Sequence, residues 1–412
     1  MMGKANSSWQ SVPVILVAGC LIAMIGFGIR SSFGLYLEPM TSANGWTREV
    51  YGLAMALQNL FWGLGLPIAG ALADKHGTGK IIIGGAILYA LGIWGMAESG
   101  GVLFLQLTGG VMVGLGIAFS AFTLAIAAMV RAVGPERRSL VMGVGTAAGS
   151  MGQVVFSPVS QGFIAAFGWF NALLISAVII LIMVPLAFCL PGASSNQESN
   201  EQSDQTLRAA VIEALSHKGY MLLTLGFFVC GFHVAFITVH LPAYVKDLGM
   251  DPLIGAYCIA LIGIMNIIGS IGSGIAGQKW SKKYSLSTIY LGRSVVTLAL
   301  LMAPKTPLVL LLFAGAMGIL WLSTVPLTTG IIAQVFGIRY MATLFGIVFV
   351  SHQLGSFMGV WLGGRIFDET GSYDGMWWAS VALGIFAAIV HLPINEKPLK
   401  RLSVHRSQSR LA

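Results

Sequence analysis

Arg30 is the residue whose chemistry stands out most, because a permanent positive charge lies in the middle of the first apolar segment. A guanidinium costs about 2.5–3.5 kcal/mol at the centre of a membrane helix and normally faces a protein interior or a water-filled cavity. No Asp or Glu lies at mid-depth in any other apolar segment. The first hypothesis is therefore an external anion, which the guanidinium fork could bind bidentately. The alternative is an arginine that bonds backbone carbonyls or helps helices pack.

Two aromatic residues accompany this arginine. On a helix, Phe27 and Phe33 share one face with Arg30. Their rings could pack against the apolar body of an organic anion whose carboxylate meets the guanidinium. We therefore predict a binding site that contains Arg30, Phe27 and Phe33.

Histidines offer the second kind of chemistry. Histidine is the side chain whose unperturbed pKa lies near neutrality, so it can carry a proton where carboxylates are missing. His233 and His352 both fall inside apolar segments. His233 is the first choice as proton carrier and His352 the second, with His352 also a ligand-binding candidate. A structural hydrogen bond is the alternative for each.

Composition places the chain in a membrane. Of its residues 56% are hydrophobic and only 9% are charged, whereas a soluble domain has about 25% charged residues. The net charge of +8 does not indicate nucleic acid, because most Lys and Arg lie in alternate loops and the C-terminal tail. The four cysteines lack metal or redox spacing, and no phosphate loop or nucleophile triad occurs. We expect no cofactor, no metal and no enzymatic activity, and an ATP-driven pump is disfavoured.

Apolar runs predict twelve transmembrane helices in an all-α fold of two six-helix bundles. The expected domains are an N-terminal bundle over 1–190, a cytoplasmic linker over 191–218, a C-terminal bundle over 219–393 and a cytoplasmic tail over 394–412. The predicted spans lie near 12–38, 48–72, 79–97, 101–130, 139–166, 169–190, 219–245, 252–277, 286–303, 306–333, 341–367 and 375–393.

The distribution of basic residues sets the expected orientation. The loops at Lys75 and Lys80, at 131–138 and at 279–283 are basic, as is the tail, while the opposite loops are mainly acidic. The positive-inside rule then puts both termini in the cytoplasm of a protein in the cell (inner) membrane.

The two halves repeat. A shift of 203 residues places Arg30 on His233. The same shift superposes three pairs of prolines or glycines, namely Pro39 and Pro242, Gly143 and Gly346, and Gly152 and Gly355. Repeats of this kind form pseudo-symmetric transporters with a substrate site near the midplane. His233 would then lie opposite Arg30 in a central cavity.

At this point the chain resembles the major facilitator superfamily over essentially its whole length. The stretch from Gly70 to Lys80, with Asp74, Lys75 and Gly77 between them, is similar to the loop between helices 2 and 3 of that superfamily. A degraded copy follows at 274–283, with Gln278 at the position of the acid. The resemblance implies a gate at the cytoplasmic side in which Gly70, Asp74 and Lys75 take part. The alternative is a turn and orientation signal only.

Three stretches resemble the monocarboxylate and oxalate/formate branch, namely 44–49, 149–158 with 167–169, and 363–374. Members of this branch typically carry an arginine in helix 8 that binds carboxylate, but 252–277 has no charged residue. Where some members have a helix 11 lysine, this chain has His352. Arg30 would then be the relocated anion anchor.

The resemblance also guides the choice among polar residues at membrane depth, which could bind substrate or join helices. We favour Gln153 and Asn266, because helices 5 and 8 pack between the halves in this family. Arg293 lies about two turns into an outer helix, and we expect its side chain to reach the cytoplasmic surface.

These features together predict a secondary active transporter, monomeric in the lipid bilayer, that moves a small organic anion by alternating access. The anion is expected to be a monocarboxylate and the coupling ion a proton. The first alternative is an exporter of amphiphilic or drug-like compounds, and the second is a membrane receptor that does not transport. Import against export and symport against exchange stay open.

Overall fold

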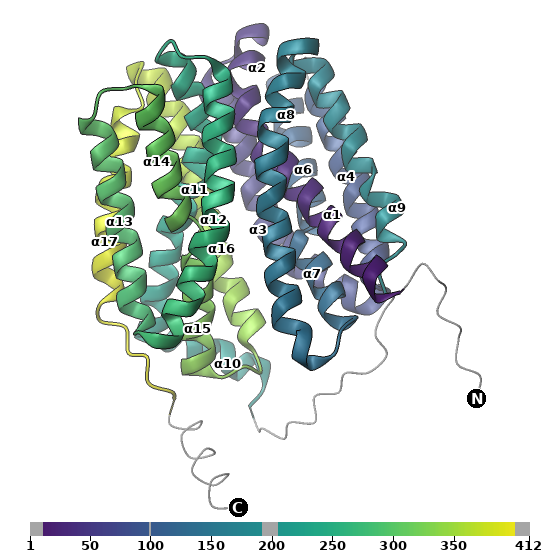
Figure 1. Cartoon of the computed structure of the whole chain (residues 1–412), viewed down its shortest axis with the longest axis vertical. Helices are drawn as coiled ribbons and strands as arrows, with labels where there is room; N and C mark the ends of the chain where they lie inside the picture. Colours follow the sequence, from purple (N-terminus) through teal and green to yellow (C-terminus); the bar gives the residue numbers. More distant parts are fainter. Residues whose placement is uncertain (1–10, 99, 192–204, 400–412) are drawn as a thin grey trace, which may run out of the picture.

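The computed structural model describes residues 11–98, 100–191 and 205–399, so the expected linker and tail lie partly outside the described residues. The described chain is helical, as predicted (Figure 1). The helices of the first half are α1 Val12–Ser31, α2 Leu37–Asn44, α3 Arg48–His76, α4 Thr78–Ala97, α5 Val102–Leu105, α6 Val113–Phe119, α7 Phe122–Arg131, α8 Arg138–Leu181 and α9 Met183–Ala187. Those of the second half are α10 Leu207–Ser216, α11 Lys218–Asp247, α12 Pro252–Lys279, α13 Lys282–Met302, α14 Pro307–Leu320, α15 Thr324–Phe336, α16 Met341–Thr370 and α17 Asp374–His391.

Eleven helical segments of the described chain are long and apolar enough to cross a membrane. One of them contains α8, whose 44 residues exceed the roughly 20 that one crossing needs. Gly168 divides α8, because its φ of 77° lies in the left-handed region that an L side chain rarely adopts. The first arm of α8 corresponds to the predicted span near 139–166, and the second arm together with α9 corresponds to the span near 169–190.

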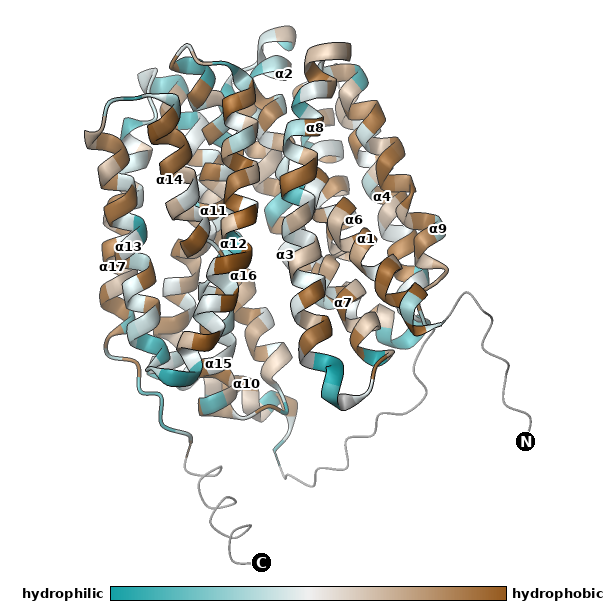
Figure 2. Ribbon diagram, in the orientation of Figure 1, coloured by the Kyte–Doolittle hydropathy of each residue, from teal (hydrophilic) through white to brown (hydrophobic). Residues whose placement is uncertain are grey.

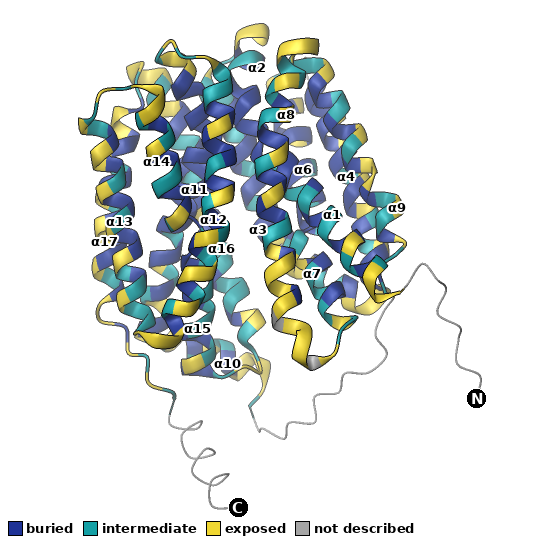
Figure 3. Ribbon diagram, viewed as in Figure 1, coloured by how far each residue is buried: buried dark blue, intermediate teal, exposed yellow. Residues whose placement is uncertain are grey.

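Apolar side chains form two hydrophobic cores, one built mainly from helices up to α9 and the other from α10 onward. Hydrophobic residues predominate along the helices, and hydrophilic residues gather at their ends (Figure 2). Buried residues fill the interior, and the exposed apolar residues lie on the outer faces (Figure 3). Across the two halves α3 packs on α16 and α8 packs on α12.

The fourth crossing of each half is broken at the same place. The break between α6 and α7 contains Ser120, and the break between α14 and α15 contains Ser323, 203 residues later. Each hydroxyl bonds the carbonyl four residues earlier, Gly116 O at 2.6 Å and Ile319 O at 2.5 Å. Such back-bonding bends helices. The break therefore follows the repeat register that the sequence predicts.

The molecule has two different ends. At the end that carries α2, the halves meet closely: a Cβ added at Gly34 would lie 2.2 Å from the carbonyl oxygen of Thr238. At the other end, which carries Asp74, the ribbons of the two halves diverge (Figure 1). We call these the α2 end and the Asp74 end.

Candidate anion-binding site

Arg30 lies in the last turn of α1, and its side chain contacts α3. Nη2 of Arg30 donates to Oδ1 of Asn59 at 2.7 Å. The amide nitrogen of Asn59 donates to the carbonyl of Met55 at 2.8 Å, which fixes the amide so that its oxygen faces the arginine. The Nε of Arg30 is buried and has no hydrogen-bond partner. The described partners of this cation are thus neutral, and one of its donors is unused.

Aromatic rings cover the guanidinium. Its carbon lies 4.5 Å from the ring centre of Trp62 and 5.8 Å from that of Phe27. These residues line a small cavity together with Gly26, Tyr89, Ile117, Ser120, Ala121 and Phe122, so the cavity adjoins the break between α6 and α7. The indole Nε1 of Trp62 is also buried without a partner. Arg30 and Trp62 thus both line the cavity, and each has a buried donor without a partner, which suits an anionic acceptor.

Of the two phenylalanines predicted beside Arg30, only Phe27 lines this cavity. Phe33 is 2% exposed and packs its ring 6.5 Å from the ring centres of Tyr36 and Tyr89. It lies where α1 has ended and a 3-10 turn over Phe33–Tyr36 has begun, so the helical face that the spacing implied is not continued. Phe33 thus packs against Tyr89, which lines the cavity, but does not line the cavity itself.

An aromatic bridge, formed by Trp62, Phe349 and His352, leads from this pocket into the second half. Trp62 meets Phe349 of α16 edge to face, with ring centres 5.3 Å apart. Phe349 stacks on His352 at 5.6 Å with planes 10° apart. Nδ1 of His352 donates to Oε1 of Gln353 at 3.1 Å, since an amide oxygen only accepts. His352 is therefore connected to Arg30 through two rings.

Gln153 and Asn266 join the halves instead of lining the Arg30 pocket. Nε2 of Gln153 in α8 donates to the carbonyl of Ile259 in α12 at 2.8 Å. Nδ2 of Asn266 in α12 donates to the hydroxyl of Ser150 in α8 at 3.0 Å. These contacts match the helix-joining alternative, and no described contact connects either residue to Arg30.

His233 lies inside the second half, away from the contacts of Arg30. Its Nε2 donates to the carbonyl of Ser380 in α17 at 2.8 Å, and its Nδ1 is buried without a partner. The repeat register places His233 at the position of Arg30 in the chain, but its side chain packs against α17. The two residues share no partner among the described contacts.

Arg293 does not reach the surface, and our expectation for it was wrong. The residue is 1% exposed, and its guanidinium donates to the carbonyl of Leu320 at 2.8 Å and to that of Trp321. The break after α14 leaves these carbonyls without helical hydrogen bonds, so they accept from the arginine. The hydropathy of the sequence does not show that such acceptors are available. Nη2 of Arg293 also lies 3.5 Å from the sulfur of Cys230.

The predicted gate residues lie at the Asp74 end. The Asp74 side chain is 78% exposed, and its carboxylate lies 3.8 Å from Nη1 of Arg131 in α7. Lys75 is exposed, and the space around Gly70 is open. The ion pair of Asp74 is thus made within the first half, and a gating role across the halves stays a prediction.

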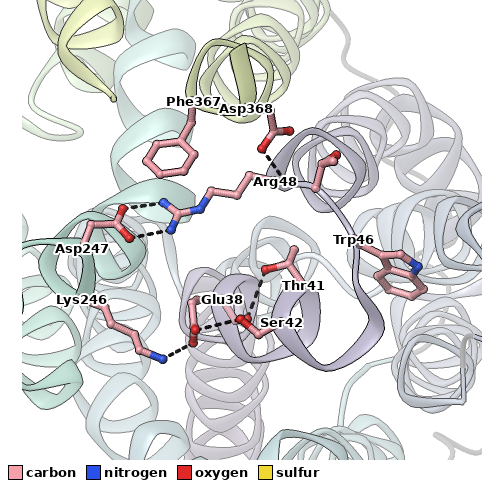
Figure 4. A pocket seen from close by; sticks show the side chains of 10 residues that line it. Glu38, Thr41, Ser42, Trp46, Arg48, Lys246, Asp247, Phe367 and Asp368 are labelled. Carbon is pink, nitrogen blue, oxygen red and sulfur yellow. Dashed lines mark hydrogen bonds and ion pairs between the residues drawn. The ribbon is translucent and has the colours of Figure 1, made fainter. Parts of the chain in front are cut away.

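The α2 end carries a network that the sequence analysis did not find, and we call its members, Glu38, Arg48, Lys246, Asp247 and Asp368, the α2-end network (Figure 4). Arg48 bonds both oxygens of Asp247 at 2.6 Å, and its guanidinium lies 3.7 Å from the ring centre of Phe367. Asp368 accepts from the backbone nitrogens of Arg48 and Glu49 at 3.0 and 2.7 Å. Lys246 pairs with Glu38. Every one of these bonds joins the two halves.

Tyr373 anchors this network. Arg48 donates to its hydroxyl at 3.0 Å, and Nδ1 of His240 lies 2.9 Å from the same oxygen. Nε2 of His240 lies 2.8 Å from the carbonyl of Val360, so Nε2 carries the ring proton and Nδ1 accepts from Tyr373. Burial raises the pKa of Tyr373 above its usual value, which keeps the hydroxyl available as a donor.

The chain is similar to known membrane transporters in both sequence and structure. A model described as the Major Facilitator Superfamily matches residues 16–359. Monocarboxylate transporter 13 of Rattus norvegicus is 26% identical over 368 residues, which cover 87% of this chain and 83% of that protein. The crystal structure of a D-xylose-proton symporter has a TM-score of 0.72 at 15% identity and covers 94% of this chain and 99% of that chain. A bacterial homologue of the human lysosomal transporter Spinster, solved inward-facing and occupied, has a TM-score of 0.73 at 14% identity, covering 94% and 97%.

Proposed function

The chain belongs to the Major Facilitator Superfamily of membrane transporters, and on that premise we propose that it moves a small organic monocarboxylate by proton symport. The Arg30 pocket carries this proposal. It combines a half-buried cation, a neutral partner and two buried donors without partners, those of Arg30 Nε and Trp62 Nε1. A carboxylate can accept from both donors and balance the charge, which a neutral or cationic substrate cannot do. The name of the rat relative supports the same class.

His352 is the proton carrier that we favour within this proposal. It is 6% exposed and reaches Arg30 through the aromatic bridge, whereas the described contacts of His233 lie within the second half. A carboxylate bound at Arg30 would cancel the charge of that arginine and so remove its repulsion of a protonated His352. Loading of the anion and the proton would then assist each other, which is the requirement for symport.

Alternating access would use the two ends of the molecule. The positive-inside rule puts the Asp74 end in the cytoplasm, so the α2-end network closes the external side in the state described. Opening that side requires the Arg48–Asp247 and Lys246–Glu38 pairs to separate and Asp368 to leave the first turn of α3. Closing the cytoplasmic side would bring the Asp74 region against the second half.

Counterflow in proteoliposomes tests the proposed function. Vesicles loaded with unlabelled lactate, pyruvate or benzoate should take up the labelled acid when they contain the wild-type protein. Arg30→Gln should abolish uptake because the anion loses its charged partner. Arg365→Gln is the matched control, since Arg365 is exposed and pairs with Glu369 of its own helix. It should transport like the wild type.

The same vesicles discriminate the alternatives. Exchange of a cationic dye, with no exchange of any carboxylate, would indicate the exporter of amphiphilic compounds. Carboxylate binding without flux would indicate a receptor. Equal carboxylate uptake by the wild type and Arg30→Gln would refute the role of Arg30.

A further inference from the structure

The inference here rests on the proposed function and concerns the chemical class of the substrate. We propose that the Arg30 pocket is built for an aromatic monocarboxylate, in which one carboxylate is conjugated to a planar ring. The observations are the aromatic rings beside the guanidinium, the apolar surroundings and the single charge of the pocket.

The preference for a planar substrate follows from the geometry of the ion pair between the guanidinium and a carboxylate. A bidentate guanidinium–carboxylate pair lies in one plane. In a benzoate-like acid the ring continues the plane of its carboxylate, so it also continues the plane of the guanidinium. The aromatic side chains that flank Arg30 would then flank the substrate ring, with Trp62 at 4.5 Å and Phe27 at 5.8 Å from the guanidinium carbon. Offset or edge contacts between such rings are favourable.

The preference for a substrate with a single carboxylate follows from the residues that line the cavity. Among the described residues that line the cavity, Arg30 is the one cation, and the others are aromatic, aliphatic or small, with Ser120 the one hydroxyl of an aliphatic side chain. A second carboxylate would therefore be buried against apolar groups with no cation to pair with it. The pocket should reject dicarboxylates.

The walls must move to admit a ring, and the fold provides for this movement. The cavity measures about 10 Å³, enough for about one water. Phe122 packs against Phe27 with ring centres 5.7 Å apart and is the first residue of α7, directly after the break at Ala121. A rotation at this break would take Phe122 off Phe27 and leave a slot beside Trp62. A planar ring fits such a slot better than a puckered ring of equal size.

A panel of four acids tests this proposal by inhibition of labelled benzoate counterflow. Benzoate is compared with cyclohexanecarboxylate, which has the same size and charge but a puckered ring, with terephthalate, which adds a second carboxylate, and with lactate. We expect inhibition constants about tenfold higher for cyclohexanecarboxylate and at least about 100-fold higher for terephthalate. Similar constants for benzoate and cyclohexanecarboxylate, or for benzoate and terephthalate, would overturn the proposal.

Two variants extend the test to the residues. Trp62→Leu should raise the inhibition constant of benzoate about tenfold more than that of lactate. Trp94→Leu is the control, because Trp94 is 53% exposed on the outer face of α4 and should leave the panel unchanged. If Trp62→Leu does not fold, the inhibition constants of the four acids on the wild-type protein still test the proposal. Lactate uptake that needs Arg30 but shows no preference for a ring would refute this inference and leave the proposed function standing, whereas no carboxylate uptake would refute the function itself.

Discussion

Arg30 and Asn59 form a charged hydrogen bond in which only one partner carries a charge. A carboxylate at position 59 would have neutralised the arginine permanently, and a buried ion pair of that kind needs no ligand. The amide instead orients the guanidinium and leaves its charge for the substrate. The arrangement therefore depends on the difference of one atom between Asn and Asp.

The first prediction replaces Asn59 by aspartate. Asn59→Asp should place a carboxylate about where Oδ1 now lies, 2.7 Å from Nη2 of Arg30. Because this internal anion competes at high effective concentration, the KM for a carboxylate substrate should rise by roughly 100-fold. Asn59→Ser, which adds no charge, should change KM much less. A normal KM in Asn59→Asp, measured by counterflow, would show that the anion binds elsewhere.

The second prediction concerns the proton. Wild-type uptake should increase when the external pH is lowered, because symport carries a proton inward with each anion. His352→Gln keeps a hydrogen-bonding side chain beside Gln353 but cannot carry a proton, so its net uptake should lose this pH dependence while exchange continues. His233→Gln serves as the comparison and should keep the pH dependence. If His233→Gln alone flattens the profile, the coupling residue is His233.

Sequence reasoning found part of this site. A charge in an apolar segment is visible in one dimension, and Phe27 follows from helical spacing, so both were predicted. Trp62 was missed because it comes from a different helix, and no periodicity tells which face of α3 meets α1. Asn59 had a signal, since it is a polar residue at membrane depth three positions before Trp62.

At the scale of elements, the break between α14 and α15 explains how the buried Arg293 is accommodated. Hydropathy located Arg293 near a helix end but could not show that a neighbouring helix is interrupted beside it. The carbonyls of Leu320 and Trp321 lack helical partners, and the arginine supplies donors to both. These bonds show that Arg293 holds the two ends of the broken helix together.

The third prediction follows from this role. Arg293→Met keeps much of the apolar volume but removes the donors, and each buried acceptor left unsatisfied costs roughly 1–3 kcal/mol. The melting temperature of the purified protein in detergent should fall by about 5–10 °C. Transporters that do fold should keep a KM near that of the wild type. Arg365→Met is the matched control at an exposed position. An unchanged melting temperature together with a raised KM would instead put Arg293 in the binding site.

At the scale of the whole molecule, the fold was predictable from the sequence, but the conformation in which the α2 end is closed was not. Apolar run lengths predicted the helical crossings. The breaks at Ser120 and Ser323 were not predicted, but they are 203 residues apart and so agree with the predicted register. The major facilitator resemblance is likewise confirmed by the family match. The acidic and basic residues of the α2-end network were interpreted only as orientation signals. Their pairing joins residues about 200 to 320 positions apart, such as Arg48 with Asp247 and with Asp368, and local sequence patterns carry no trace of it.

The fourth prediction fixes the two halves at the α2 end. Glu38→Cys combined with Lys246→Cys should allow a short bis-maleimide to link the positions that now form an ion pair. Because the link holds the α2 end closed, it should stop net uptake. Each single variant, treated alike, should keep transporting, which controls for reaction with the native cysteines. Full transport by the linked protein would show that this end does not open during the cycle.

The most direct test of the account is the affinity of the purified protein for a carboxylate, measured by isothermal titration calorimetry with benzoate on the wild type, Arg30→Gln and Arg365→Gln. Binding separates recognition from the later steps of transport, which gates and proton transfer also control. The account predicts that Arg30→Gln weakens binding by at least about 100-fold, as expected for loss of the charged partner of the carboxylate, while Arg365→Gln binds like the wild type. An unchanged affinity in Arg30→Gln would contradict the claim that this arginine is the anion anchor.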